Sequence, residues 1–302
     1  MSWQGCEEPT CTEQGSALAT RIESRAKDLG GFSVRRVLPA AARRHVGPFV
    51  FFDQMGPADF GPGQGIEVRP HPHIGLATLT YLFEGEILHQ DSLGYRQAIR
   101  PGAVNLMTAG RGIVHSERTD PALRRSGQRL HGIQSWMALP DALADCDPAF
   151  VHHPADSLPR VDRDGARITL VAGSAFGERS PVETASPTLY LDIALEPGAR
   201  LAVPDARERG LFVAEGRVRV EGDAPLAEGT MGVLGTGANV TLEALVASRV
   251  ILIGGEPVGP RELWWNFVAR DPARIARARD DWRAGRFAMV PGDDEFIPLP
   301  EA

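Results

Sequence analysis

Glycine and proline recur at short intervals along the chain and separate short segments of β-type sequence. The 302 residues include 33 glycines and 24 prolines. Short strands divided by regular turn signals are typical of all-β sandwiches and barrels. The sequence therefore predicts an all-β protein. The expected strands are 49–53, 77–83, 86–90, 104–107, 113–117 and 132–138, followed by 167–172, 188–194, 210–214, 217–221, 231–234, 239–243 and 248–253.

The two sets of expected strands resemble each other around one turn. Residues 82–88 (LFEGEIL) and 213–219 (VAEGRVR) both read as strand, Glu-Gly turn, strand. We therefore expect two tandem copies of one β-barrel unit. The predicted divisions are an N-terminal tail (1–30), an N-terminal domain (31–145), a polar linker (146–165) and a C-terminal domain (166–302).

A short helix is expected near the C-terminus, at about 272–285. Asp271 can cap its N-terminus, and Pro272 suits the first helical turn. An apolar stripe at helical spacing follows, formed by Ile275, Ala278 and Trp282. We expect this stripe to pack against a barrel.

Two triplets in the first half carry residues that bind metals. His71-Pro72-His73 and His115-Ser116-Glu117 each place two such residues two positions apart. On a β-strand, residues two apart point to the same side. Two such strands side by side would form a site of three histidines and one carboxylate. The candidate ligands are therefore His71, His73, His115 and Glu117.

The second copy lacks these residues. Counted from its Glu-Gly turn, the positions that correspond to His71 and His73 are Ala202 and Pro204. No histidine follows His153. We therefore expect one metal site, in the N-terminal domain, and a structural or partner-facing C-terminal domain.

Composition excludes several classes of protein. The net charge of −7 lacks the basic excess of nucleic-acid-binding proteins, so no nucleic-acid partner is expected. No apolar run is long enough to cross a bilayer, and no signal pattern is present, which predicts a cytoplasmic protein without a membrane partner. No dinucleotide-binding glycine fingerprint or P-loop occurs.

The residues around the triplets resemble the pirin family of the cupin superfamily. The resemblance covers nearly the whole chain after about residue 30. It lies in the runs GPFVFFDQMGP (47–57), RPHPHIGLATLTYLFEG (69–85), HQDSLG (89–94), MTAGRGIVHSE (107–117), LHGIQSWMALP (130–140) and WWNFVARD (264–271).

This resemblance implies two tandem cupin barrels of the double-stranded β-helix (jelly-roll) type. It implies one metal ion, usually iron, held by His71, His73, His115 and Glu117, and no metal in the second barrel. We expect one divalent ion, Fe(II) first, with Mn, Ni, Cu, Co or Zn as alternatives. Some relatives resemble quercetin 2,3-dioxygenase in activity, and others are nuclear regulators of transcription factors.

Two departures from the family pattern bear on the substrate pocket. Ala77 and Thr78 stand where related proteins place a glutamate after the second histidine, and Gln54 stands where relatives often have histidine. Glu117 is then the one carboxylate candidate near the histidines. Either departure would alter the pocket if these side chains lined it.

The resulting hypothesis is a pirin-like, metal-dependent dioxygenase of the quercetinase type. It would cleave a flavonol such as quercetin, or a related enol or phenol, with O₂. Glu117 would act as the catalytic general base that accepts the hydroxyl proton of this small aromatic substrate. The alternatives are a non-catalytic, metal- or redox-responsive regulator that binds a protein partner, and a cupin enzyme with another substrate.

Further side chains are candidates for the walls of the site. An unbroken strand after His73 would direct Leu79 and Tyr81 into the cavity, although core packing explains them equally well. His131 and Gln134 could orient the ligands. We expect His89, beyond the Glu84-Gly85 turn, to be a structural hydrogen-bonding residue.

Overall fold

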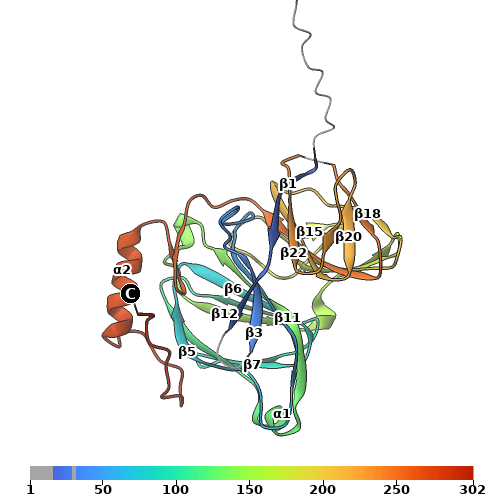
Figure 1. Cartoon of the computed structure of the whole chain (residues 1–302). Helices are drawn as coiled ribbons and strands as arrows, with labels where there is room; N and C mark the ends of the chain where they lie inside the picture. The colour runs from blue at the N-terminus through green and yellow to red at the C-terminus, as the bar shows by residue number, and fades with distance from the viewer. Residues whose placement is uncertain (1–15, 29–31, 238, 302) are drawn as a thin grey trace, which may run out of the picture.

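In the computed structural model, which describes residues 16–28, 32–237 and 239–301, two β-barrels lie side by side (Figure 1). Each barrel has a seven-stranded and a four-stranded antiparallel sheet. In the N-terminal barrel, the larger sheet has the order β12 (Ala149–His153), β9 (Val104–Thr108), β6 (Leu76–Glu84), β11 (Gln128–Ala138), β4 (Phe49–Phe60), β3 (Ser33–Leu38) and β2 (Arg25–Asp28). The smaller sheet has the order β5 (Glu67–His73), β10 (Ile113–Arg118), β7 (Ile87–Asp91) and β8 (Arg96–Ile99).

The C-terminal barrel repeats this arrangement. Its larger sheet has the order β1 (Leu18–Glu23), β22 (Thr230–Leu234), β19 (Glu208–Glu215), β24 (Ser248–Gly255), β17 (Thr188–Leu195), β14 (Ala166–Ala172) and β13 (Arg160–Arg163). Its smaller sheet has the order β18 (Arg200–Ala202), β23 (Thr241–Ala244), β20 (Arg217–Val220) and β21 (Leu226–Ala227). Two short hairpins are β15 (Ser174–Ala175) with β16 (Glu178–Arg179), and β25 (Glu262–Trp264) with β26 (Phe267–Ala269). The helical segments are α1 (Pro121–Ser126), η1 (Asp141–Leu143), η2 (Ala155–Ser157) and α2 (Pro272–Arg283).

The predicted all-β fold of two tandem barrels with a short C-terminal helix is confirmed, and every expected strand overlaps an observed one. At α2, the Asp271 carboxylate accepts the backbone N–H of Ala273, and Pro272 opens the first turn. No helix among the described residues has the length and apolar character needed to span a bilayer.

The segment expected to be a tail is partly structured. β1 pairs with β22 of the C-terminal barrel, whereas β2 pairs with β3 of the N-terminal barrel. The N-terminal segment therefore joins both barrels before the first one is complete; residues 1–15 and 29–31 lie outside the described residues. The expected linker also contains strands, because β12 pairs with β9 and β13 with β14. We propose that the domain boundary falls between β12 and β13.

The two barrels share one apolar core along their larger sheets. Phe52 of β4 meets Phe212 of β19 edge to face, with ring centroids 5.1 Å apart. A buried polar group spans the same contact: the Tyr81 hydroxyl donates to Asp192 at 3.0 Å, and Arg249 donates to both Asp192 oxygens. The outward face of the first barrel's larger sheet is therefore covered by its partner barrel.

The interior of the C-terminal barrel is filled by aliphatic side chains. Leucine, valine and isoleucine from both of its sheets form one buried cluster, with Leu211, Val218 and Leu252 completely inaccessible to solvent. This close packing takes up the space that a ligand would need.

The C-terminal helix and the residues after it return to the first barrel (Figure 1). Ile275 and Ala278 of α2 pack with Ile74 and Phe267, and Trp282 packs with Val114 of β10. The expectation that this apolar stripe packs against a barrel is confirmed.

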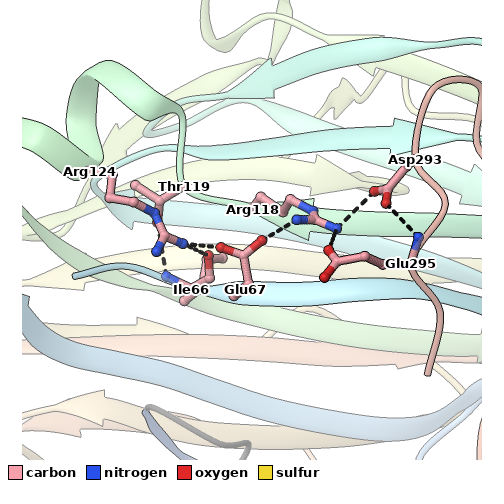
Figure 2. A network of polar contacts seen from close by, with 7 residues as sticks. All are labelled: Ile66, Glu67, Arg118, Thr119, Arg124, Asp293 and Glu295. Atoms are coloured by element: carbon pink, nitrogen blue, oxygen red, sulfur yellow. Dashed lines mark hydrogen bonds and ion pairs between the residues drawn. The ribbon is translucent and has the colours of Figure 1, made fainter. Parts of the chain in front are cut away.

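We call residues 290–299 the C-terminal strap. The strap is bonded to β5 and β10, where the Ile297 N–H donates to the Pro70 carbonyl at 2.8 Å. Figure 2 shows its ion pairs: Arg118 holds Asp293 and Glu295 at 2.9 and 2.6 Å, and also pairs with Glu67. The chain after the second barrel thus closes over the smaller sheet of the first.

Candidate metal centre

Three buried histidines converge inside the N-terminal barrel. His71 and His73 project from β5 and His115 from the neighbouring β10. Their ring centroids lie 4.5–5.0 Å apart, and one nitrogen from each ring belongs to a group of atoms within 4.8 Å of one another. Each histidine is at most 6% exposed. The two-residue spacing on adjacent strands thus brings these side chains together as expected.

Strand register explains the convergence. β5 and β10 are antiparallel, with His115 opposite His71 and Ile113 opposite His73. The pairing shifts by one residue before Glu117, which lies opposite Val68. The extra residue is on β5, in the stretch that contains Pro70, which has no N–H for the ladder. β10 itself stays regular against β7, so His115 and Glu117 keep the same side.

The environment of the three imidazoles favours their neutral form. Burial lowers the pKa of His71 to about 4, although a hydrogen bond to the Arg69 carbonyl raises it. Burial, followed by the neighbouring imidazoles, lowers the pKa of His73 and of His115 well below the usual value. Neutral imidazole is the form that binds a metal ion.

Glu117 lines the same cavity as the histidines but lies outside their cluster. Its carboxylate lies 3.5 Å from both the Thr80 hydroxyl and the Gln134 amide nitrogen. Its oxygens are not in the group formed by the three histidines. Burial raises the pKa of Glu117, while His89 and these two polar neighbours lower it. The group can therefore accept a proton within the cavity, and its role as a fourth ligand remains a proposal.

The cavity beside the histidines has a volume of about 820 Å³ and opens to the surface. Phe51 and Trp136 from the larger sheet line it and stack on each other, with ring centroids 3.9 Å apart. Trp136 also lies edge to face with His73, at 5.1 Å. Trp265 and Ile297, from the end of the chain, complete the wall. Cavities of this size and apolar character commonly hold small organic ligands.

Of the two readings left open for Leu79 and Tyr81, the structure shows core packing and not the cavity wall. The strand after His73 is broken at Gly75, where φ is +68° and an added Cβ would lie 2.0 Å from the Val268 carbonyl oxygen. β6 begins after this break in the other sheet, so the alternation of sides does not continue. Leu79 and Tyr81 instead pack in the core between the barrels. Thr80, on the opposite side of β6, reaches Glu117.

Gln54 and Ala77, two of the residues that depart from the family pattern, also lie away from the cavity wall. Gln54 donates to the Ala214 carbonyl of the second barrel and lies 2.8 Å from His131. Ala77 belongs to the core between the barrels. Of the two candidates for orienting ligands, His131 therefore supports the contact between the barrels, whereas Gln134 lines the cavity beside Glu117.

His89 is a buried hydrogen-bonding residue, as expected from its place beyond the Glu84-Gly85 turn, whereas sequence reasoning missed its partner Asp91. The His89 Nε2 lies 2.9 Å from an Asp91 oxygen, and its Nδ1 lies 3.3 Å from the Nδ1 of His115. The pair repeats the two-residue spacing of the recognised triplets, on the strand next to β10, and this spacing was the available signal. Trp265 belongs to the run WWNFVARD that resembles the family, but no sequence pattern places Trp265 or Ile297 at the cavity, because only the return of the chain brings them to the first barrel.

The donor set fits a metal ion. The Nε2 atoms of His73 and His115 face each other at 3.0 Å, and both imidazoles are neutral. Three imidazoles with a carboxylate nearby suit Fe(II), Mn(II), Ni(II) and related divalent ions. A mononuclear centre held by these groups would retain open positions for other ligands, unlike a closed structural zinc site.

Comparisons with known proteins cover both barrels. The sequence profile described as Pirin matches residues 31–137, and that of the Pirin C-terminal cupin domain matches residues 190–288. A pirin-like protein of Caulobacter vibrioides is 52% identical over 286 residues, which cover 93% of this chain and 98% of that protein.

Two crystal structures of quercetin 2,3-dioxygenase from Acinetobacter baumannii have similar folds. The first has a TM-score of 0.86 and 38% identity, with 94% of each chain covered. The second has a TM-score of 0.84 and 28% identity, with 90% of this chain and 98% of that chain covered.

Proposed function

The chain belongs to the pirin family, and from this premise we propose that it is a metal-dependent dioxygenase. Its substrate would be a flavonol such as quercetin, or a related enol or phenol, and its co-substrate O₂. The observation that carries the proposal is the set of three neutral, converging imidazoles on a cavity with aromatic walls. The similarity to quercetin 2,3-dioxygenase structures supports it.

We propose that His71, His73, His115 and Glu117 hold one divalent ion, with Fe(II) as the first candidate. When bound, the metal supplies Lewis acidity that stabilises a deprotonated substrate hydroxyl. The chain must then bring the hydroxyl to the histidines and remove its proton. Phe51 and Trp136 give the cavity an apolar, aromatic wall against which the rings of a flavonol can pack.

Glu117 is the proposed proton acceptor. Thr80 donates its hydroxyl to the Gln134 side-chain oxygen at 2.6 Å, which directs the Gln134 amide N–H groups towards Glu117. The Gln134 amide nitrogen then lies 3.5 Å from the carboxylate and faces it inside the cavity. The raised pKa of Glu117 increases its basicity, which suits proton abstraction from a weakly acidic hydroxyl near neutral pH.

Oxygen consumption tests the proposal directly. Protein loaded with Fe(II) should consume O₂ when quercetin is added, and metal-free protein should not. Glu117→Gln should lower kcat by about 10²- to 10⁴-fold, the usual contribution of a general base. Gln54→Ala is a matched control, because Gln54 lies at the contact between the barrels. Absence of O₂ uptake in intact, Fe(II)-loaded protein would refute the quercetinase assignment.

A second candidate function is a metal- or redox-responsive regulator that binds a protein partner. The observation in its favour is the direct connection between the centre and the surface: Arg118, next to Glu117, holds the strap through Asp293 and Glu295. Limited proteolysis of the strap in Fe(II)- and Fe(III)-loaded protein tests it. Cleavage that differs between the two states favours regulation, and identical cleavage argues against it.

A further inference from the structure

His89 and Asp91 approach the centre from β7 without belonging to the histidine cluster. β7 pairs with β10 so that Asp91 lies opposite His115 and His89 opposite Glu117. Asp91 is fully buried and His89 is 4% exposed. The ring of His89 is stacked on Phe150, with centroids 4.4 Å apart and an interplanar angle of 15°. Contacts outside the cluster of His71, His73 and His115 thus hold both side chains in place.

The hydrogen bonds of Asp91 determine where the protons lie. One carboxylate oxygen accepts the backbone N–H groups of Leu93 and Tyr95, at 2.9 and 3.2 Å. The other oxygen, 2.9 Å from the Nε2 of His89, accepts the proton of that nitrogen. A His89 ring that carries its single proton on Nε2 can only accept at Nδ1. The Nδ1 of His115, 3.3 Å away, must then be the donor.

We propose that Asp91 and His89 form a relay that fixes His115 in its Nδ1–H tautomer and leaves its Nε2 free to bind the metal. The inference rests on the metal site of the proposed function and adds two positioning residues to it. His71 is oriented differently, by the backbone carbonyl of Arg69 at 2.9 Å. Mutation can therefore reverse the tautomer of His115 through a side chain that does not touch the metal.

Asp91→Asn is the decisive substitution because it is isosteric and distant from the proposed ion. The amide oxygen can keep the Leu93 and Tyr95 N–H groups, so the amide nitrogen faces His89 and donates to it. His89 must then donate from Nδ1, and His115 must carry its proton on Nε2, the nitrogen that should bind the metal. A carboxylate-to-amide change has this effect in the hydrolase triad, where it produces the wrong histidine tautomer.

The experiment measures Co(II) binding to the full-length chain by competition with a chelator, together with the visible spectrum of bound Co(II). We expect Asp91→Asn and His89→Phe each to weaken binding by about 10- to 100-fold and to change the spectrum. Phenylalanine can maintain the stack on Phe150 but cannot accept a proton. His89→Gln, whose side-chain oxygen can accept the His115 N–H, should bind more tightly than His89→Phe.

A double variant separates a relay from general loosening of the site. Because Asp91 acts through His89, the combined variant should bind no more weakly than His89→Phe alone. His131→Phe is the matched control, since His131 is also buried and packs on an aromatic ring, Phe83, at the other side of the larger sheet. Its Kd and spectrum should match those of the wild type.

The results distinguish the relay from the function on which it rests. Wild-type Kd and spectrum in folded Asp91→Asn and His89→Phe would overturn the relay and leave the dioxygenase proposal intact. Additive losses in the double variant, or no advantage of Gln over Phe at position 89, would also overturn it. A wild-type protein that binds no Co(II), Mn(II) or Fe(II) would overturn both proposals.

Discussion

Replacing Arg118 by methionine should release the C-terminal strap from the first barrel. The Arg118 side chain is 21% exposed and pairs with three carboxylates (Figure 2). Methionine retains most of the apolar stem and removes the charge. All three carboxylates then lose their common partner. The energetic cost differs among them, because they differ in burial and in whether another partner remains.

The largest cost arises at Asp293. Its side chain is 13% exposed, and it loses a charge-assisted hydrogen bond that contributes about 1.5–3 kcal/mol. Glu295 is 55% exposed and returns to water, at a cost of at most about 1 kcal/mol. Glu67 still pairs with Arg124. We therefore expect strap opening to become about 2–3 kcal/mol easier, with Asp293 as the main contributor.

Hydrogen exchange at the Ile297 amide measures this change, because that N–H is bonded to Pro70 only while the strap is docked. A decrease of about 2–3 kcal/mol in the free energy of strap opening corresponds to an exchange rate about 30- to 150-fold higher. Arg129→Met is the matched control: Arg129 also pairs with two carboxylates, Glu84 and Asp59, but is 50% exposed. Equal protection of the Ile297 amide in Arg118→Met and Arg129→Met would refute the conclusion that the ion pairs of Arg118 hold the strap.

Three further predictions concern the metal centre and the contact between the barrels. His73→Ala should lose most of its metal on purification while its circular dichroism spectrum is unchanged, and retention of metal would contradict the proposed site. In the metal-free protein, His71 has a pKa of about 4 when folded and 6.5 when unfolded, so the unfolded chain binds more protons between these values. The free energy of unfolding should therefore fall by about 2–3 kcal/mol from pH 7 to 4.5 in urea titrations, and less in His71→Gln. Asp192→Ala leaves Arg249 without its partner between the barrels and should cost about 3 kcal/mol in the same assay; a loss below about 1 kcal/mol would contradict it.

Local sequence patterns predicted the strands and the C-terminal helix well, because these elements depend on residues that are close together in the chain. The alternation in β10 correctly indicated that His115 and Glu117 share a side, since the strand stays regular against β7. Asp271 and Pro272 marked the start of α2 because capping depends on residues that are adjacent in the chain. The repeated Glu-Gly turn indicated two barrels for the same reason.

The choice between cavity wall and core for the strand after His73 depended on a break that alternation cannot reveal. Gly75 turns the chain from one sheet to the other, so counting residues from His73 placed Leu79 on the wrong side. Its glycine was visible in the sequence, but its consequence depends on Val268, which lies almost 200 residues away. The two faces of β6 also lie in apolar environments, one in the interior of the first barrel and one against the second barrel. The hydrophobicity of its residues does not show which side chains belong to which face.

The proposed metal ligands could be predicted from short sequence patterns, whereas the walls of the cavity could not. β5 and β10 alone bring the three histidines together, so the proposed ligand set depends on one pair of strands. The walls depend on the larger sheet, which supplies Trp136, and on the returning chain, which supplies Trp265 and Ile297. Substitutions in the strap or in the β25–β26 hairpin can therefore alter which ligand fits while the three histidines stay in place. For the same reason, a chain with these triplets can be assigned a metal site from its sequence with better support than a substrate.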